Sequence, residues 1–180
     1  MEIRKRKFQT LTLILVSIVT VSLLALFIGS NLYLGNSNSK EKYSPYIPDF
    51  DGYTRVNVEA QVINNYGIVQ LTGNCFRIIA YTEPWQARSI ENGLRGKVDV
   101  RPNCHDITKE ILDLFGIKVI ALKINEVRNN TYIGELILQQ GNKVLSLDVR
   151  PSDGTAIALR ENAPIYIKNE LLEKYGKRIC

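Results

Sequence analysis

Apolar and polar residues alternate in the middle of the chain with the two-residue period of half-buried β-strands. The first such stretch runs from Val56 to Val62. It ends in Asn-Asn-Tyr-Gly at 64–67, and because Asn and Gly tolerate positive φ, we predict a hairpin into a strand over 68–71. Gly73-Asn74 predicts a second turn, into a strand over 76–81. The pattern therefore predicts three consecutive strands joined by tight turns.

The same order recurs later in the chain. Alternating apolar residues over 120–127 predict a strand, and Asn-Asn at 129–130 and Gly-Asn at 141–142 predict the two turns that follow it. Each set of three strands leads into a helix that opens with Pro84 or Pro151, where a missing N–H costs nothing. The matching turns and prolines are offset by 65, 68 and 67 residues. We interpret the two halves as a duplication, and chance recurrence of common turn residues is the alternative.

Helical spacing also occurs outside the two halves. Apolar residues at helical spacing from Ile107 to Leu114 predict an amphipathic helix that ends near Gly116. After the second half we predict a strand over 164–167 and a closing helix over 169–175, with its two leucines and Tyr175 turned inward. Runs of strands with helices inserted between them indicate an α+β fold with two similar β-rich halves.

The N-terminal part has a different composition. The 21 residues from Phe8 to Ile28 carry no charge, and such a helix spans about 31 Å, the thickness of a bilayer core. Four basic residues precede this run, and no charge follows it until Lys40, so the positive-inside rule predicts a cytoplasmic N-terminus and an external C-terminal part. We therefore predict a single-pass membrane protein. Its predicted parts are a basic cytoplasmic tail at 1–7, a transmembrane anchor at 8–29, a flexible linker at 30–52, a domain at 53–176 and a C-terminal tail at 177–180.

Two other interpretations of the N-terminal run stay open. A cleaved signal peptide is disfavoured because the apolar stretch exceeds the usual length and no A-x-A-like site follows it. A cytoplasmic domain held by an inverted anchor requires the charge rule to fail.

Charge and cysteine content restrict the function classes. The formal net charge is +5, but from Tyr46 to Cys180 there are 17 Lys and Arg against 16 Asp and Glu, so the domain is nearly neutral. The three cysteines are too few for a disulfide framework or a paired-cysteine zinc site, and Cys75, in a strand pattern, is predicted to be buried. The Walker, dinucleotide-binding, zincin and serine-hydrolase motifs are absent from the sequence, which leaves those activities without support.

Two polar clusters could carry chemistry. The only histidine, His105, lies just before the predicted central helix and next to Asp106, where it could act as a general base or a metal ligand. The alternative is that Asn103 or Asp106 caps the helix and His105 is a surface side chain. In the second cluster, Arg150 and Asp153 lie where a strand becomes a helix, a position that favours anions; a structural cap and ion pair is the alternative.

Both clusters carry a family resemblance. The run RPSDGTAIALRENAPIYI at 150–167, preceded by Asp148, and the run RPNCHDI at 101–107 resemble the two motifs of the bifunctional nuclease (BFN) domain family. This resemblance implies a small α+β domain, a homodimer, and nuclease activity toward RNA and DNA as in some members. The polar cluster of the family falls here on His105, Asp106, Arg150, Ser152 and Asp153. One departure is Gln86-Ala87, where many members have Glu-Ala, and a second is Gly154 in place of alanine.

These observations combine into one catalytic hypothesis. Asp106 and Asp153 would hold a divalent ion, Mg²⁺ or Mn²⁺, while His105 activates water and Arg150 stabilises the charged transition state. The function predicted is a membrane-anchored nuclease that binds nucleic acid. The alternative is a noncatalytic interaction or assembly module at the cell surface, which Gln86 and the single histidine would suit.

Overall fold

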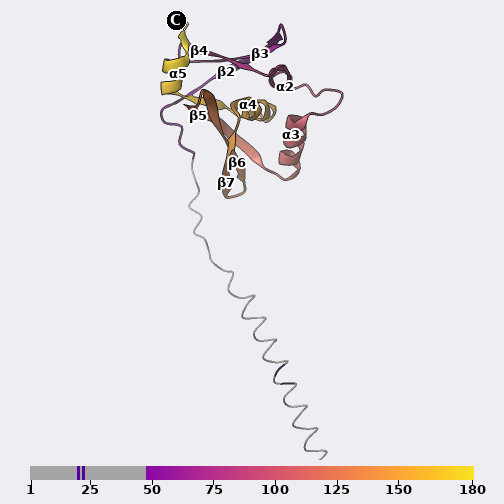
Figure 1. The fold of residues 1–180 in the computed structure, drawn as a ribbon. Helices are drawn as coiled ribbons and strands as arrows, with labels where there is room; N and C mark the ends of the chain where they lie inside the picture. The colour runs from indigo at the N-terminus through magenta and orange to yellow at the C-terminus, as the bar shows by residue number, and fades with distance from the viewer. Residues whose placement is uncertain (1–19, 21, 23–47) are drawn as a thin grey trace, which may run out of the picture. The chain divides into compact units, whose positions relative to one another are not determined.

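The computed structural model describes Thr20, Ser22 and residues 48–180 (Figure 1). Apart from Thr20 and Ser22, the predicted cytoplasmic tail, the membrane anchor and most of the predicted linker therefore lie outside the described residues. Among the residues that are described, no helix has the length and apolar character needed to cross a bilayer.

The first half consists of three antiparallel strands and a helix, as predicted: β2 (Asn57–Ile63), β3 (Tyr66–Gly73), β4 (Phe76–Thr82) and α2 (Pro84–Leu94). The first turn is Asn64-Asn65 with φ of 47° and 64°, the two positive values of a type I′ hairpin. The second turn lies one residue later than predicted, at Asn74-Cys75, because Gly73 pairs with Phe76 as the last residue of β3.

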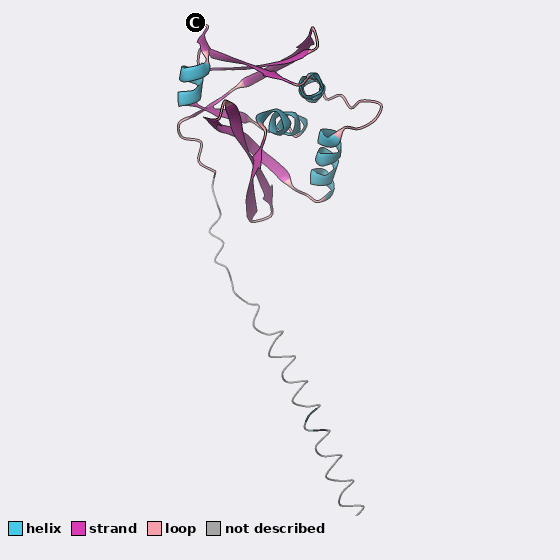
Figure 2. Cartoon of the chain, in the orientation of Figure 1, coloured by secondary structure: helices cyan, strands magenta, loops and turns pink. Residues whose placement is uncertain are grey.

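The second half repeats this order: β5 (Lys118–Arg128), β6 (Thr131–Gln140), β7 (Lys143–Val149) and α4 (Pro151–Arg160) (Figure 2). Its turns lie at Asn129-Asn130 and Gly141-Asn142, as predicted. With the corrected turn at 74–75, one offset of 67 residues relates the second turns and the helix starts of the two halves. The shorter offset of the first turn reflects two additional residues in β6, and the bulges in β5 absorb the change in register.

Five further elements complete the domain: β1 (Tyr53–Arg55), α3 (Cys104–Leu114), β8 (Ile165–Lys168), α5 (Asn169–Tyr175) and β9 (Lys177–Arg178). The strands of the second half lie in a five-stranded sheet with the order β1-β8-β5-β6-β7, and those of the first half lie in a four-stranded sheet with the order β2-β3-β4-β9. Only the β5–β8 pairing among these is parallel. The predicted α+β class is confirmed.

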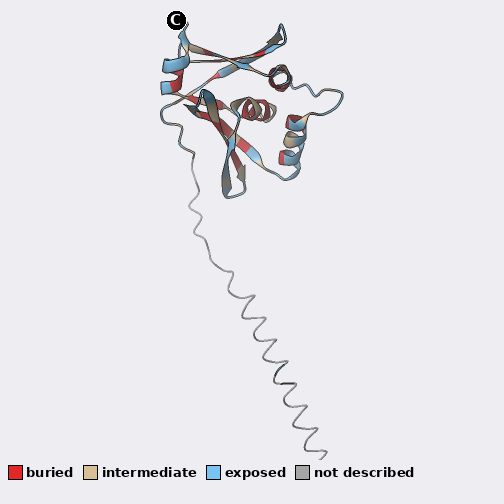
Figure 3. Ribbon diagram, viewed as in Figure 1, coloured by how far each residue is buried: buried red, intermediate tan, exposed pale blue. Residues whose placement is uncertain are grey.

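The core lies between the two sheets and around α2 and α4, which pack against each other. Figure 3 shows the buried residues concentrated on these two helices and on β5. Close packing depends on Gly93 of α2, where a Cβ atom would lie 3.2 Å from the Cβ of Leu159 in α4. Two halves of similar order thus form one core through their helices.

The structure corrects two predictions about helix faces. In α3 the apolar residues Ile107, Ile111 and Leu114 are 49%, 48% and 77% exposed. The helix packs instead through Leu112, which joins the core, and through His105 and Asp106, whose polar contacts are described below, so the stripe of Ile107, Ile111 and Leu114 stays uncovered. In α5 Leu171 and Leu172 are buried as predicted, but Tyr175 is 42% exposed, because its ring packs edge-on against Tyr132 near the surface.

The ends of the domain also differ from the prediction. Residues 177–180 do not form a free tail: β9 pairs with β4, and Cys180 forms a disulfide with Cys75. Cys75 is exposed in its turn at φ 64°, so the prediction of a buried strand residue was wrong. At the other end, Lys123 donates to the carbonyl of Asp49 over 2.8 Å, so the last residues of the predicted linker contact the domain.

Candidate functional site

The site is built at the start of α4, where β7 ends. Pro151 occupies the first turn of α4, and Arg150 before it is the extended N-cap residue. The Nε of Arg150 donates to Oδ2 of Asp153 over 2.6 Å, which is the ion pair expected as the structural alternative. The Arg150 side chain is still 66% exposed, and among the described residues its Nη groups have no partner. Two strong donors are therefore available to an anion.

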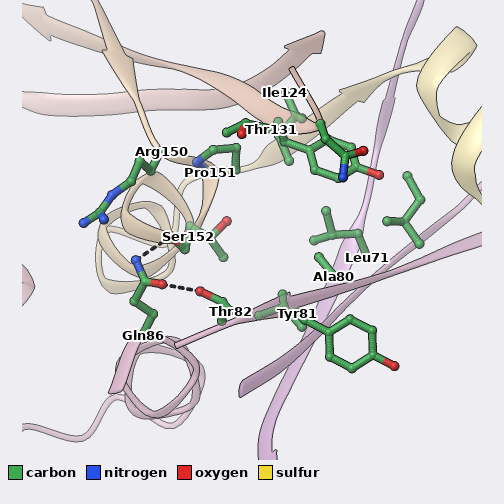
Figure 4. Close-up of a pocket in the computed structure, with 15 residues that line it drawn as sticks. Leu71, Ala80, Tyr81, Thr82, Gln86, Ile124, Thr131, Arg150, Pro151 and Ser152 are labelled. Carbon is green, nitrogen blue, oxygen red and sulfur yellow. Dashed lines mark hydrogen bonds between the residues drawn. The ribbon is translucent and has the colours of Figure 1, made fainter. Parts of the chain in front are cut away.

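Gln86 joins this group from α2 of the first half. Its Nε2 donates to Oγ of Ser152 over 3.0 Å and to Oδ1 of Asp153 over 3.4 Å. Its Oε1 accepts from the hydroxyl of Thr82 and from the N–H of Glu83, which fixes the amide orientation. Figure 4 shows Gln86 pointing across the gap between the helix starts toward Ser152. The amide at this position is thus a donor to the carboxylate of Asp153.

His105 approaches the same carboxylate from α3. Its Nε2 lies 3.3 Å from Oδ1 of Asp153, and its Nδ1 lies 2.8 Å from Oγ of Ser89. Because a carboxylate only accepts, Nε2 carries the proton and Nδ1 accepts from the Ser89 hydroxyl. His105 is 4% exposed, and burial lowers its pKa below the ordinary value although Asp153 acts in the opposite direction. In the alternative interpretation the helix cap is confirmed, but the surface histidine is wrong: His105 is a buried, neutral bridge.

Ser89, His105 and Asp153 form a hydrogen-bonded chain, but Ser89 is not placed as a nucleophile. Its Oγ accepts from Nη2 of Arg160 over 3.2 Å and from Nδ2 of Asn103 over 3.3 Å, besides donating to His105. Ser89 is 4% exposed, and these three partners occupy its hydroxyl. The chain therefore orients His105 and, through it, Asp153.

Asp106 has a separate role behind the site. Its Oδ1 accepts from Nε of Arg160 over 2.7 Å, and its Oδ2 accepts from the N–H of Asn103 over 2.9 Å, which closes the predicted helix cap. Burial by itself would raise the pKa of Asp106, but the hydrogen bond from Asn103 and the Arg160 guanidinium together lower it. Arg160 and Asp106 are each 5% exposed and form a buried ion pair that fastens α3 to α4.

Two pockets flank the start of α2. The first, with a volume of about 330 Å³, has an apolar floor that includes Leu71, Ile78 and Ile124, and Arg150 and Ser152 lie in its wall (Figure 4). The second, of about 580 Å³, is lined by His105 and by the remaining residues Asn65, Glu83, Pro84, Trp85, Arg88, Ser89, Asp99, Asn103 and Cys104. Asp153 is linked to both pockets, because its Oδ1 contacts Gln86, which lines the first pocket, and His105, which lines the second.

The structure brings most of the predicted site residues together. Arg150 and His105 each contact Asp153, and Ser152 is joined to it through Gln86. Asp106 instead faces Arg160, so neither of its oxygens is free to share a metal ion with Asp153. Within the described part of the chain no group of three or more metal-ligating side chains occurs. The predicted metal pair is a poor fit to these contacts, and we derive no step through a metal.

Sequence reasoning missed three contributors, namely Ser89, Arg160 and the donor role of Gln86. A signal for Gln86 was present in the repeat, because the offset of 67 residues places Gln86 and Asp153 at equivalent positions in their helices. No comparable pattern marked Ser89, whose contacts are all more than ten residues away in sequence.

Comparison with known families decides how this arrangement is classified. Residues 76–179 match the bifunctional nuclease domain, a span that contains both polar clusters and Gln86. The chain belongs to the bifunctional nuclease domain family. The match begins at β4, within the first half, so the BFN domain signature covers α2, α3 and the whole second half.

Curated relatives share this region. An uncharacterized protein of Mycobacterium tuberculosis is 31% identical over 91 residues, which are 51% of this chain and 54% of that protein. Bifunctional nuclease 1 of Arabidopsis thaliana is 32% identical over 82 residues, 44% of this chain and 25% of that protein. Bifunctional nuclease 2 of Oryza sativa subsp. japonica is 32% identical over 81 residues, 43% and 25% of the two chains. This chain thus spans about half of the mycobacterial relative and a quarter of the plant relatives.

Proposed function

We propose that this BFN domain cleaves phosphodiester bonds in RNA or DNA. Membership of the family and the names of the plant relatives support a nuclease-like activity. The observation that carries the proposal is the convergence at the start of α4. There an exposed guanidinium, a partly exposed carboxylate and a buried imidazole from α3 form one connected cluster.

The contacts assign a role to each group. Arg150 keeps Nε on Asp153 and offers its Nη groups to a phosphate, where they would stabilise the charge that develops on the equatorial oxygens. The Asp153 side chain is 22% exposed and can take a proton from an attacking water. His105 has both ring nitrogens engaged, with Ser89 and with Asp153, and acts through Asp153 as a positioning residue. This differs from the hypothesis that His105 itself activates water.

Cleavage assays on the full-length chain test this proposal. Arg150→Ala should lower the rate on single-stranded RNA or DNA at least about 100-fold, the order of magnitude lost with one transition-state donor. Arg128→Ala is the matched control, because Arg128 is also exposed and paired with a nearby carboxylate, Glu126. Loss of activity in both variants, or in neither, would contradict the assignment. Assays with and without Mg²⁺ and Mn²⁺ test the predicted metal requirement separately.

We further propose that the domain stands outside the cell on a single-pass anchor. The Cys75–Cys180 disulfide supports an oxidising location. Cys104 is free and exposed, so it can react with a thiol reagent, whereas Cys180 is held in the disulfide and cannot report on the location of the domain. A membrane-impermeant thiol reagent should label Cys104 on intact cells, and labelling only after lysis would reverse the proposed topology.

A noncatalytic interaction module is the second candidate function. The exposed stripe of Ile107, Ile111 and Leu114 on α3 favours it, because a contiguous apolar helix face is typical of a protein contact. If this stripe pairs two chains, Ile111→Glu should convert a homodimer into a monomer in light-scattering measurements. An unchanged mass would remove the support for this candidate.

A further inference from the structure

The second pocket contains the only tryptophan of the chain, Trp85, and the catalytic proposal does not use it. Trp85 follows Pro84 in the first turn of α2 and is 51% exposed. Its indole lies nearly parallel to the imidazole of His105, with an interplanar angle of 14° and a centroid distance of 6.5 Å. The buried imidazole thus holds a large aromatic ring at the wall of an open pocket.

The lining of this pocket indicates which part of a ligand fits there. Arg88 is the only guanidinium in the lining, whereas Glu83 and Asp99 both contribute carboxylates. Two carboxylates disfavour a phosphate group, but they are compatible with an uncharged heterocycle that carries amino groups. A volume of about 580 Å³ exceeds what a single nucleobase needs. Stacking on an indole suits every base, because each has a π-face.

The position of Trp85 relates the pocket to the proposed cleavage site. Trp85 and Gln86 are successive residues that line different pockets, and Gln86 contacts Ser152 next to Arg150. His105 contacts both Trp85 and Asp153. The geometry points to Trp85 as a stacking platform for an unpaired nucleobase next to the phosphate held by Arg150. This inference rests on the proposed function and specifies its substrate as single-stranded, because the bases within a duplex are stacked on one another and do not present a free face.

Intrinsic fluorescence of the full-length chain tests this directly, since all tryptophan emission comes from Trp85. The probes are a deoxyadenosine octamer and an abasic octamer of the same charge. The octamer with bases should quench the emission saturably, and the abasic octamer should not. Equal effects of both probes, or no quenching by either, would overturn the stacking site.

Substitutions give a second readout, the affinity for a dye-labelled octamer measured by anisotropy. Trp85→Ala should weaken binding roughly 5-fold to 150-fold, the range for loss of one stacked base. Trp85→Phe should keep most of the affinity, because it keeps an aromatic face on which a base can stack. Phe115→Ala is the control: it removes a ring that is 66% exposed and lines neither pocket. Unchanged affinity of Trp85→Ala would overturn the inference.

The two proposals can fail separately. Cleavage of single strands by the wild type together with unaltered binding by Trp85→Ala would leave the nuclease and remove the stacking site. Saturable quenching without cleavage under any divalent-ion condition would leave a single-strand binding site and remove the nuclease.

Discussion

The two halves of the domain share one order of elements but not one chemistry. In each half three antiparallel strands lead into a helix that begins with a proline, at Pro84 or Pro151. A glycine in the middle strand, Gly67 or Gly134, lets each helix start lie against the sheet, because a Cβ there would meet backbone oxygen within 3.0 Å. The scaffold is therefore repeated in detail.

The first turns of the two helices differ. The equivalent positions carry Glu83, Trp85 and Gln86 in the first half and Arg150, Ser152 and Asp153 in the second. The second half thus supplies the ion pair, and the first supplies an amide donor and an aromatic ring. Segments between the halves connect them: His105 contacts Ser89 in α2 and Asp153 in α4. The start of α4 carries the groups of the proposed chemistry, and the start of α2 supplies the amide that orients them.

The largest expected effect comes from removing Arg160, which links α4 of the second half to Ser89 in α2 and to Asp106 in α3. Arg160→Ala leaves Asp106 buried without its partner and removes the donors to Ser89, so the free energy of unfolding should fall by about 3–5 kcal/mol. Urea denaturation at pH 7 measures it. Arg95→Ala is the control, because the Arg95–Glu91 pair is largely exposed, and it should cost less than about 1 kcal/mol. Similar losses in both variants would show that the buried Arg160–Asp106 pair contributes no more to stability than an exposed ion pair.

The second effect concerns the equivalent turns at 74–75 and 141–142, of which only the first is tied by a disulfide. Replacing Cys75 and Cys180 together by serine frees a loop closed over a sequence separation of 105 residues. We expect a loss of about 2–4 kcal/mol in thermal or urea unfolding. Dithiothreitol should lower the stability of the wild type to that of the double variant, and a wild type unaffected by reduction would contradict this.

A third test makes the two helix starts alike. Gln86→Glu replaces a donor by a carboxylate next to Oδ1 of Asp153, which the amide nitrogen now approaches to 3.4 Å. Like-charge repulsion should lower the free energy of unfolding at pH 7.5 by about 2 kcal/mol, and acidification should reduce the deficit. Gln61→Glu, on the exposed side of β2, is the control. A variant as stable as wild type at pH 7.5 would mean that the amide donor is dispensable.

The smallest effect is the pH dependence due to His105. Burial lowers the pKa of His105 in the folded state. As the pH falls below about 6.5, the imidazole is therefore protonated in the unfolded chain before it is protonated in the folded chain. Its contribution to stability is therefore complete above that pH and is lost on acidification, by at most about 1.4 kcal/mol per pH unit. His105→Gln should flatten this part of the stability curve between pH 7 and 5. Parallel curves would show that His105 does not titrate there.

Much of the fold was predictable because it follows local patterns. Alternation, Asn-Asn turns and helix-opening prolines identified both halves, and apolar residues at helical spacing identified the helices between and after them. The misplaced turn at 74–75 shows the limit of such signals: Cys75 adopts a positive φ that sequence rules reserve for Gly or Asn. There the tertiary link to Cys180 accompanies a conformation that local propensity disfavours.

The candidate site was predictable only where motifs marked it. The resemblance directed attention to His105 and to the turn at 150–153, which the structure joins. Distance in sequence concealed the rest: Arg160 reaches Ser89 across 71 residues, and nothing local marks either partner. The apolar residues Ile107, Ile111 and Leu114 of α3 misled for the opposite reason, because Leu112 and polar contacts, rather than burial of that face, attach the helix.

The close approach of Gly93 and Arg160 has a consequence for any attempt to rebuild the domain from identical units. These residues are equivalent by the offset of 67, and a Cβ at Gly93 would lie 3.1 Å from Nη1 of Arg160. A protein assembled from two copies of the second half would direct two guanidiniums into the space that now accepts one. Two copies of the first half would leave Asp106 without a cation. The halves have become complementary, so neither can be exchanged for the other.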